Sequence, residues 1–151
     1  MWLKKLFGSF VYAFRGVART AREERNFRIH LAAVCYVTWA GFLAELDALG
    51  WAAVLLCFGA VLSAELVNTA LEHLCDAVCP EKNPHIKAAK DAAAGAVLVL
   101  SIAAVGVAAA VFGPWVASGQ LIQIGKETWW AALIFIISLP IAILWIRGKK
   151  N

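Results

Sequence analysis

Four polar side chains interrupt an apolar stretch of this 151-residue chain, and their spacing aligns them. Intervals of three or four residues separate Glu65, Asn68, Glu72 and Asp76. In an α-helix, such intervals place side chains on one face, one above another. Carboxylates inside an apolar run are costly in a bilayer and mark functional sites. This polar stripe therefore predicts a site that faces other helices, a cavity or a bound cation. The alternative is a stripe that only joins helices.

Depth along the polar stripe separates its two glutamates. At about 1.5 Å of rise per residue, Glu65 and Glu72 lie about 10 Å apart, too far to share one proton or one metal ion. Glu65 lies deeper in the bilayer, where loss of water makes a carboxylate a stronger proton acceptor. We therefore expect Glu65 to be a general base and Glu72 to bind a hydrated cation.

Further charged residues are expected at the same membrane interface. Lys90 and Asp91 begin a later apolar run, and Glu24 lies at the edge of an apolar helical face. A cation, acids that can hold Mg²⁺ and a deeper base favour phosphate chemistry on a membrane lipid. The sequence has neither a Walker motif nor a kinase glycine-rich loop. Cys75-x-x-x-Cys79 with scattered histidines lacks a standard zinc spacing.

The composition identifies the class of protein that carries these residues. Apolar residues make up 62% of the chain and charged residues 16%, with a mean hydropathy of +0.75. A soluble domain of this length could not bury so much apolar surface. Disorder, nucleic-acid binding and a disulfide scaffold fit equally poorly. The sequence predicts an integral membrane protein.

Apolar runs and basic residues predict the helices and their orientation. We expect an all-α membrane fold in which an amphipathic surface helix, residues 1–24, precedes the spans; packing of this helix on protein is the alternative. The spans are expected at about 29–46, 48–74 and 88–112, with an extra fourth at 128–146. Of the 14 lysines and arginines, only Lys126 falls in the connections expected outside. Both termini are therefore predicted to be cytoplasmic.

The motifs have a specific resemblance. Glu65-Leu-Val-Asn-Thr-Ala-Leu-Glu72 and Ala89-Lys-Asp-Ala-Ala-Ala-Gly95 resemble the signature of the small prokaryotic diacylglycerol kinase and undecaprenol kinase family. Two N-terminal elements, Tyr12-Ala-Phe-Arg-Gly16 and Glu24-Arg-Asn-Phe-Arg28, match in order. The resemblance covers about residues 2–112. It implies homotrimers of three-span protomers with active sites between protomers, in the bacterial inner membrane.

This resemblance implies an activity and a division of the chain. Residues 1–112 would form a lipid kinase core, and residues 113–151 an extra transmembrane segment of unassigned role. The core would transfer phosphate from ATP to a membrane lipid alcohol at the cytoplasmic leaflet. The residue patterns favour undecaprenol, with diacylglycerol the other substrate left open.

Roles follow by matching positions. The resemblance implies that Glu65 is the general base, that Asn68 orients the base or the substrate, and that Glu24 and Glu72 hold Mg²⁺ with ATP.

The nucleotide would meet a second group of residues. Lys90 would neutralise phosphate charge, Asp91 would contact the nucleotide, and Tyr12 would line its site. Asn83 stands where the family often has a histidine, which leaves one nucleotide contact open.

Two rival functions belong to other classes. A proton- or cation-conducting transporter could use Glu65 and Glu72 as a relay, but it would not need charged residues gathered on one leaflet. A membrane scaffold without catalytic activity would need no polar stripe.

Overall fold

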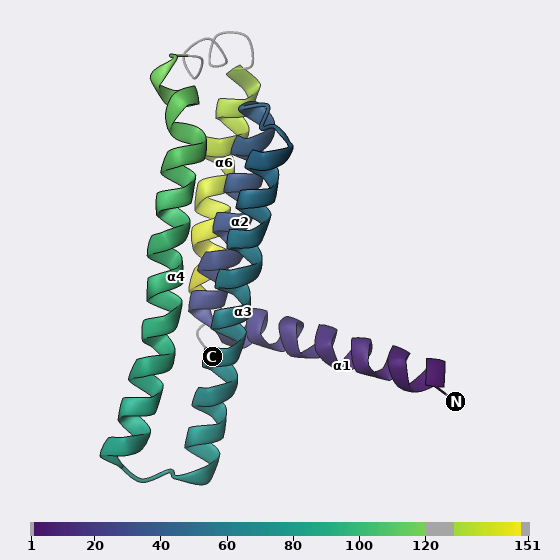
Figure 1. Ribbon diagram of the computed structural model, residues 1–151, viewed down its shortest axis with the longest axis vertical. Helices are drawn as coiled ribbons and strands as arrows, with labels where there is room; N and C mark the ends of the chain where they lie inside the picture. Colours follow the sequence, from purple (N-terminus) through teal and green to yellow (C-terminus); the bar gives the residue numbers. More distant parts are fainter. Residues whose placement is uncertain (1, 120–128, 149–151) are drawn as a thin grey trace.

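The computed structural model describes residues 2–119 and 129–148, and every regular element in these ranges is a helix. Four helices run along one another as a bundle, and α1 projects sideways from it (Figure 1). The helices are α1 (Trp2–Glu23), α2 (Arg25–Leu43), α3 (Ala48–Val78), α4 (Pro84–Ala117) and α6 (Trp129–Arg147). The expected surface helix and the four expected apolar segments are thus helical over most of their described residues; Met1 and Thr128, the first residues of two of these predictions, lie outside the described ranges.

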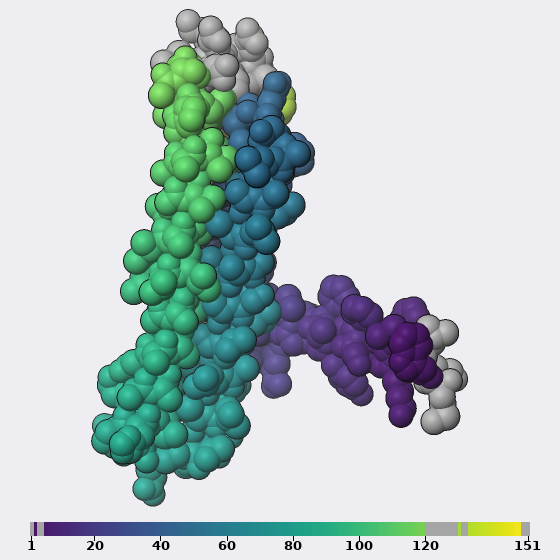
Figure 2. Space-filling view, viewed as in Figure 1, coloured from purple at the N-terminus to yellow at the C-terminus, as the bar shows by residue number. Residues whose placement is uncertain are grey.

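The surface helix α1 turns into α2 at a single residue. Glu24 has an extended backbone, with φ −96° and ψ 121°, so the helical hydrogen bonding breaks there. The space-filling view shows α1 standing clear of the bundle for most of its length (Figure 2). Its large apolar side chains are exposed, Phe7, Phe10 and Phe14 among them. An uncovered apolar face of this kind suits the headgroup layer of a membrane.

A buried arginine joins the ends of two other helices to α2. The Arg28 guanidinium donates hydrogen bonds to the backbone carbonyls of Arg22 (2.8 Å) and Ala21 (3.4 Å) near the end of α1. Its Nε donates to the carbonyl of Ile146, near the end of α6 (3.2 Å). The last carbonyls of a helix carry partial negative charge and lack partners within the helix, so one cation serves both ends.

Capping residues define the two helical hairpins. The Asp47 side chain accepts a hydrogen bond from the backbone N–H of Gly50 (2.8 Å) and begins α3. Asn83 accepts from the N–H of His85 (2.9 Å) and begins α4, with Pro84 as the first helical residue. Both arrangements satisfy N–H groups that a helix start leaves unpaired. Asn83 therefore has a structural role at the turn between α3 and α4.

Helix α6 packs on α2 through aromatic side chains. The Phe135 ring meets Tyr36 edge-on at 5.2 Å and stacks on Trp39 at 5.7 Å between ring centroids. The hydroxyls of Tyr36 and Ser138 are hydrogen-bonded at 3.1 Å. A half-buried hydroxyl needs such a partner in an apolar environment, so this pair favours one register of α6 against α2.

The apolar surface of the bundle requires a lipid or protein environment. Within the described ranges, α3 and α4 are the two helices that reach spanning length and hydropathy by themselves. The remaining bundle helices, α2 and α6, have 19 residues each. At about 1.5 Å per residue they are nearly as long as the hydrocarbon core is thick. The number of spans and their orientation remain predictions.

Candidate active site

The deep end of the polar stripe of α3 is buried, whereas Asp76 at its outer end is exposed. Glu65 is 3% exposed, and Asn68 and Thr69 are also buried. These side chains share one face because α3 continues without interruption from Ala48 to Val78. A buried carboxylate with so little contact with water is suited to accept a proton from a substrate hydroxyl.

Asn68 links the deep part of the polar stripe to its outer part. Its Nδ2 donates a hydrogen bond to Oε1 of Glu72, one turn away, at 3.0 Å. Its Oδ1 is buried and has no partner among the described residues. A buried acceptor left unpaired is costly, and such atoms often face a missing ligand. Asn68 therefore holds a buried amide oxygen that is available to a ligand, at a position in α3 between Glu65 and Glu72.

A cross-helix ion pair brings the expected phosphate-binding lysine to α3. Lys90 on α4 donates to Oδ1 of Asp76 at 2.8 Å. The Lys90 side chain is 31% exposed, and the charge of Glu72 also acts on it. The sequence reasoning placed Asp76 on the polar stripe but gave it no role. The spacing of Asp76, one helical turn beyond Glu72, indicated that it belongs to the same site. Spacing along one helix could not predict its partner on α4.

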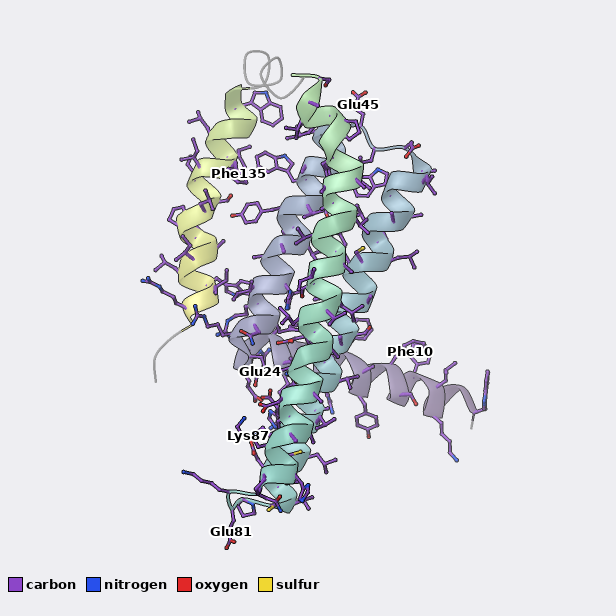
Figure 3. All side chains as sticks on the ribbon, turned by 60° about the vertical axis from the view of Figure 1, so that its left-hand side comes forward. Phe10, Glu24, Glu45, Glu81, Lys87 and Phe135 are labelled. Atoms are coloured by element: carbon purple, nitrogen blue, oxygen red, sulfur yellow. The ribbon has the colours of Figure 1, made fainter. Side chains whose placement is uncertain are left out.

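Glu24 reaches α3 from the break between α1 and α2. Its Oε1 lies 4.0 Å from Nε2 of His73. The negative charges of Glu24 and Glu72 both act on Glu65. In Figure 3, Glu24 and Lys87 lie in the same half of the molecule, and Glu45 lies at the far end. Like Asp76, His73 has no role assigned from the sequence, and the fold places it next to Glu24.

Two of the expected nucleotide residues do not join this group within one chain. Asp91 is exposed and pairs with Lys87, one turn earlier on α4. Tyr12 is 71% exposed on α1, the helix that projects from the bundle. Within residues 2–119 and 129–148, no hydrogen bond or ion pair connects either residue to Glu65, Asn68 or Glu72.

An apolar cavity lies beside the buried end of the polar stripe. It measures about 210 Å³ and is bounded by α2, α3 and α4. Val61 and Leu62 of its lining precede Glu65 by about one helical turn. Ser101 also lines the cavity, and its buried Oγ has no partner in the described part of the chain. The cavity offers an apolar ligand room close to the candidate base.

The oxygen donors at the outer end of the polar stripe are of the kind that Mg²⁺ prefers. They include the carboxylates of Glu24 and Glu72 and the unpaired Oδ1 of Asn68. Among the described residues, no group of three or more histidines, cysteines, aspartates and glutamates could hold a metal ion alone. Mg²⁺ commonly binds through one or two carboxylates together with substrate phosphates. The donor set fits a metal that arrives with a nucleotide.

Comparison with known proteins decides the family. The family model described as prokaryotic diacylglycerol kinase matches residues 11–112. The chain belongs to this family. It is 50% identical over 100 residues to the undecaprenol kinase of Bacillus subtilis (strain 168). The matched residues make up 66% of this chain and 81% of that protein. It is 43% identical over 98 residues to the diacylglycerol kinase of Synechocystis sp., covering 64% of this chain and 56% of that protein.

A third relative is the diacylglycerol kinase of Helicobacter pylori, 37% identical over 99 residues, covering 64% of this chain and 75% of that protein. No solved structure matches the chain. The protein is a membrane lipid kinase with ATP as the phosphoryl donor, and the transporter alternative has no support. The family match ends at residue 112, so α6 lies outside it.

Proposed function

We propose that the chain phosphorylates the hydroxyl of undecaprenol, with Glu65 as the general base. The observation that carries the proposal is the burial of Glu65 on the same face of α3 as Asn68 and Glu72. The 50% identity to an undecaprenol kinase supports the choice of substrate. The apolar cavity beside Glu65 supports a lipid with a long hydrocarbon chain. Diacylglycerol is the second candidate, because two other relatives are named diacylglycerol kinases.

The proposed reaction is an in-line transfer. The Glu65 carboxylate takes the proton of the lipid hydroxyl, and the hydroxyl oxygen forms a bond with the γ-phosphorus of ATP while the bond to the ADP oxygen breaks. The products are the lipid phosphate, ADP and one proton that Glu65 later releases. Asn68 would orient the base or the substrate, since its buried Oδ1 has no partner among the described residues while its Nδ2 donates to Glu72. Burial excludes water, which would otherwise compete as the acceptor.

The charged end of the polar stripe would serve the nucleotide. Glu24 and Glu72 would hold Mg²⁺, which would neutralise phosphate charge and orient the phosphates when bound. Lys90 would supply a further positive charge to the phosphates, and Asp76 would position its ammonium group. Asp91 and Tyr12 would contact the nucleotide.

We propose a homotrimer with sites between protomers, in the bacterial inner membrane with both termini cytoplasmic. The exposed position of Tyr12 on α1 supports a shared site, because the helix that carries Tyr12 projects away from the charged group of its own chain. The distribution of lysine and arginine supports the orientation.

One assay tests the proposed function directly. The purified full-length protein in detergent is given labelled ATP with Mg²⁺ and either undecaprenol or diacylglycerol. We expect transfer of phosphate to both lipids, with a higher kcat/KM for undecaprenol. A higher kcat/KM for diacylglycerol would reverse the choice of substrate, and no transfer to either would contradict the proposed function.

A further inference from the structure

Two adjoining hollows follow the contact between α2 and α6. The first, of about 400 Å³, is an apolar groove lined by Tyr36 and Trp39 of α2 and by Ile141 and Trp145 of α6, among others. An apolar groove at membrane depth is suited to a hydrocarbon chain.

The second hollow lies at the end of α6 and has a different chemistry. It measures about 520 Å³ and is lined by Arg25, Leu144, Arg147 and Gly148. On α6, Leu144 and Gly148 follow Ile141 by three and seven residues, so all three lie on one helical face. On α2, Arg25 lies seven residues before Ala32, which lines the groove, so these two residues also share one helical face. The basic hollow therefore continues the apolar groove.

The two arginines of the basic hollow are free to bind an anion. Arg25 and Arg147 are both exposed, and neither pairs with a carboxylate within residues 2–119 and 129–148. The end of α6 would by itself repel an anion, because its last carbonyls carry partial negative charge. Arg28 offsets this repulsion by donating to the carbonyl of Ile146. The hollow is thus positively charged and has unused N–H donors.

We propose that this α2–α6 seam binds one anionic glycerophospholipid of the surrounding bilayer. Its phosphate would accept hydrogen bonds from Arg25 and Arg147, and one acyl chain would lie in the apolar groove. Guanidinium groups bind phosphate through paired N–H donors, and basic residues at the membrane surface attract anionic lipids. The proposal does not depend on the proposed function.

The occupant is a bilayer lipid and not the reacting one. One side of α2, which carries Cys35 and Trp39, lines the groove. The opposite side, which carries Val34 and Val37, lines the cavity beside Glu65. At 100° per residue, these pairs point in opposite directions. A lipid in the α2–α6 seam is therefore separated from Glu65 by α2 itself.

Lipid retention tests the proposal. The full-length protein is reconstituted in nanodiscs of equal phosphatidylglycerol and phosphatidylcholine, extracted in mild detergent, and its bound lipid is measured by native mass spectrometry. We expect about one phosphatidylglycerol per protomer. The double variant Arg25→Gln/Arg147→Gln should retain about tenfold less, since two charge-assisted interactions are lost. Arg25→Lys/Arg147→Lys should retain most of it, and Arg15→Gln, which removes a charge from α1, should match the wild type.

A second variant separates loss of binding from loss of folding. Leu144→Trp keeps both charges but fills the hollow, so it too should lower phosphatidylglycerol retention at unchanged helical content. Retention at the wild-type level by both the glutamine variant and the tryptophan variant would overturn the proposal. Equal retention of phosphatidylcholine and phosphatidylglycerol by the wild type would overturn it as well. Displacement of the lipid by undecaprenyl phosphate at equimolar concentration would assign the seam to the product instead, and would overturn the choice of a bilayer lipid.

Discussion

At the scale of single residues, the glutamates of the polar stripe differ in what surrounds them. Glu65 is buried, and the structure gives its carboxylate no hydrogen-bond donor among the described residues. Glu72 is half-buried and accepts a hydrogen bond from Asn68. The first arrangement leaves a carboxylate available for a proton, and the second holds a carboxylate in a fixed position for a cation.

Glu65→Gln should lower turnover by at least about 10²-fold without abolishing nucleotide binding. Glutamine keeps the shape of the side chain but cannot accept the hydroxyl proton, and a positioned general base contributes about 10²–10⁴-fold in rate. Binding of ATP with Mg²⁺ should survive, because Glu72 lies about 10 Å away along α3. Steady-state kinetics and nucleotide titration measure both. Glu45→Gln, at the far end of the bundle, is the matched control. Loss of ATP binding and assembly together would make Glu65 a structural residue.

Glu72→Gln should raise the Mg²⁺ concentration needed for half-maximal activity and lower the maximum. The substituted amide oxygen can still accept the hydrogen bond from Asn68, so the local shape is retained while one negative charge is lost. Activity is measured against Mg²⁺ at constant ATP. An unchanged Mg²⁺ dependence would remove Glu72 from the metal site.

Lys90→Ala should raise the KM for ATP, because it removes the cation that we propose faces the phosphates. Asp76→Asn should have a smaller effect of the same sign, since it keeps the lysine and weakens only the ion pair that positions it. Lys87→Ala removes a neighbouring charge that pairs with Asp91 and is the comparison. If Lys87→Ala and Lys90→Ala raised the KM equally, Lys90 would have no special role.

At the scale of helices, Arg28 holds α1, α2 and α6 at one junction. Its three hydrogen bonds end on the carbonyls of Ala21, Arg22 and Ile146, and Glu24 lies between the helices that it joins. The fourth bundle helix, which the family match does not include, is therefore connected to the segment that carries a candidate metal ligand.

Arg28→Gln should lower the free energy of unfolding by about 2 kcal/mol or more, because hydrogen bonds to a charged group contribute about 1.5–3 kcal/mol and three carbonyls lose their donor. Arg28→Lys should recover part of the loss. The midpoint of thermal unfolding in detergent, followed by circular dichroism, measures the effect. A midpoint within error of the wild type would show that water or lipid serves these carbonyls as well as Arg28 does.

At the scale of the whole molecule, charged residues lie toward both ends of the bundle, and the surface between these ends is largely apolar. Glu24 and Lys87 lie in the half of the molecule from which α1 projects, and Glu45 lies at the opposite end (Figures 1 and 3). A bilayer would enclose the bundle between these ends, and α1 would lie at its surface.

Single cysteines introduced into a cysteine-free background should report this arrangement. A cysteine in the 113–127 connection should react with an impermeant thiol reagent in intact cells. This connection contains one basic residue, Lys126, and connections poor in lysine and arginine usually lie outside. A cysteine in the 76–90 connection should react only after the membrane is opened. Labelling of a C-terminal cysteine in intact cells would mean that the segment at 128–146 does not span.

The sequence by itself determined the features that depend on local periodicity and composition. Repeats of three and four residues aligned the polar stripe, and long apolar runs defined the helices, with boundaries within a few residues of those observed. These features are predictable because helical hydrogen bonds join residues four apart, so the face on which a side chain lies follows from its number alone.

Only the tertiary structure decided which faces meet. The pairing of Lys90 with Asp76 joins residues on two helices, and the approach of Glu24 to His73 depends on a break of one residue between α1 and α2. The contact of α6 with α2 depends on aromatic packing around Phe135. In a chain with apolar side chains on most helical faces, hydrophobicity does not distinguish one partner from another. Close packing and a few buried hydrogen bonds make that choice, and these exist only after the helices have come together.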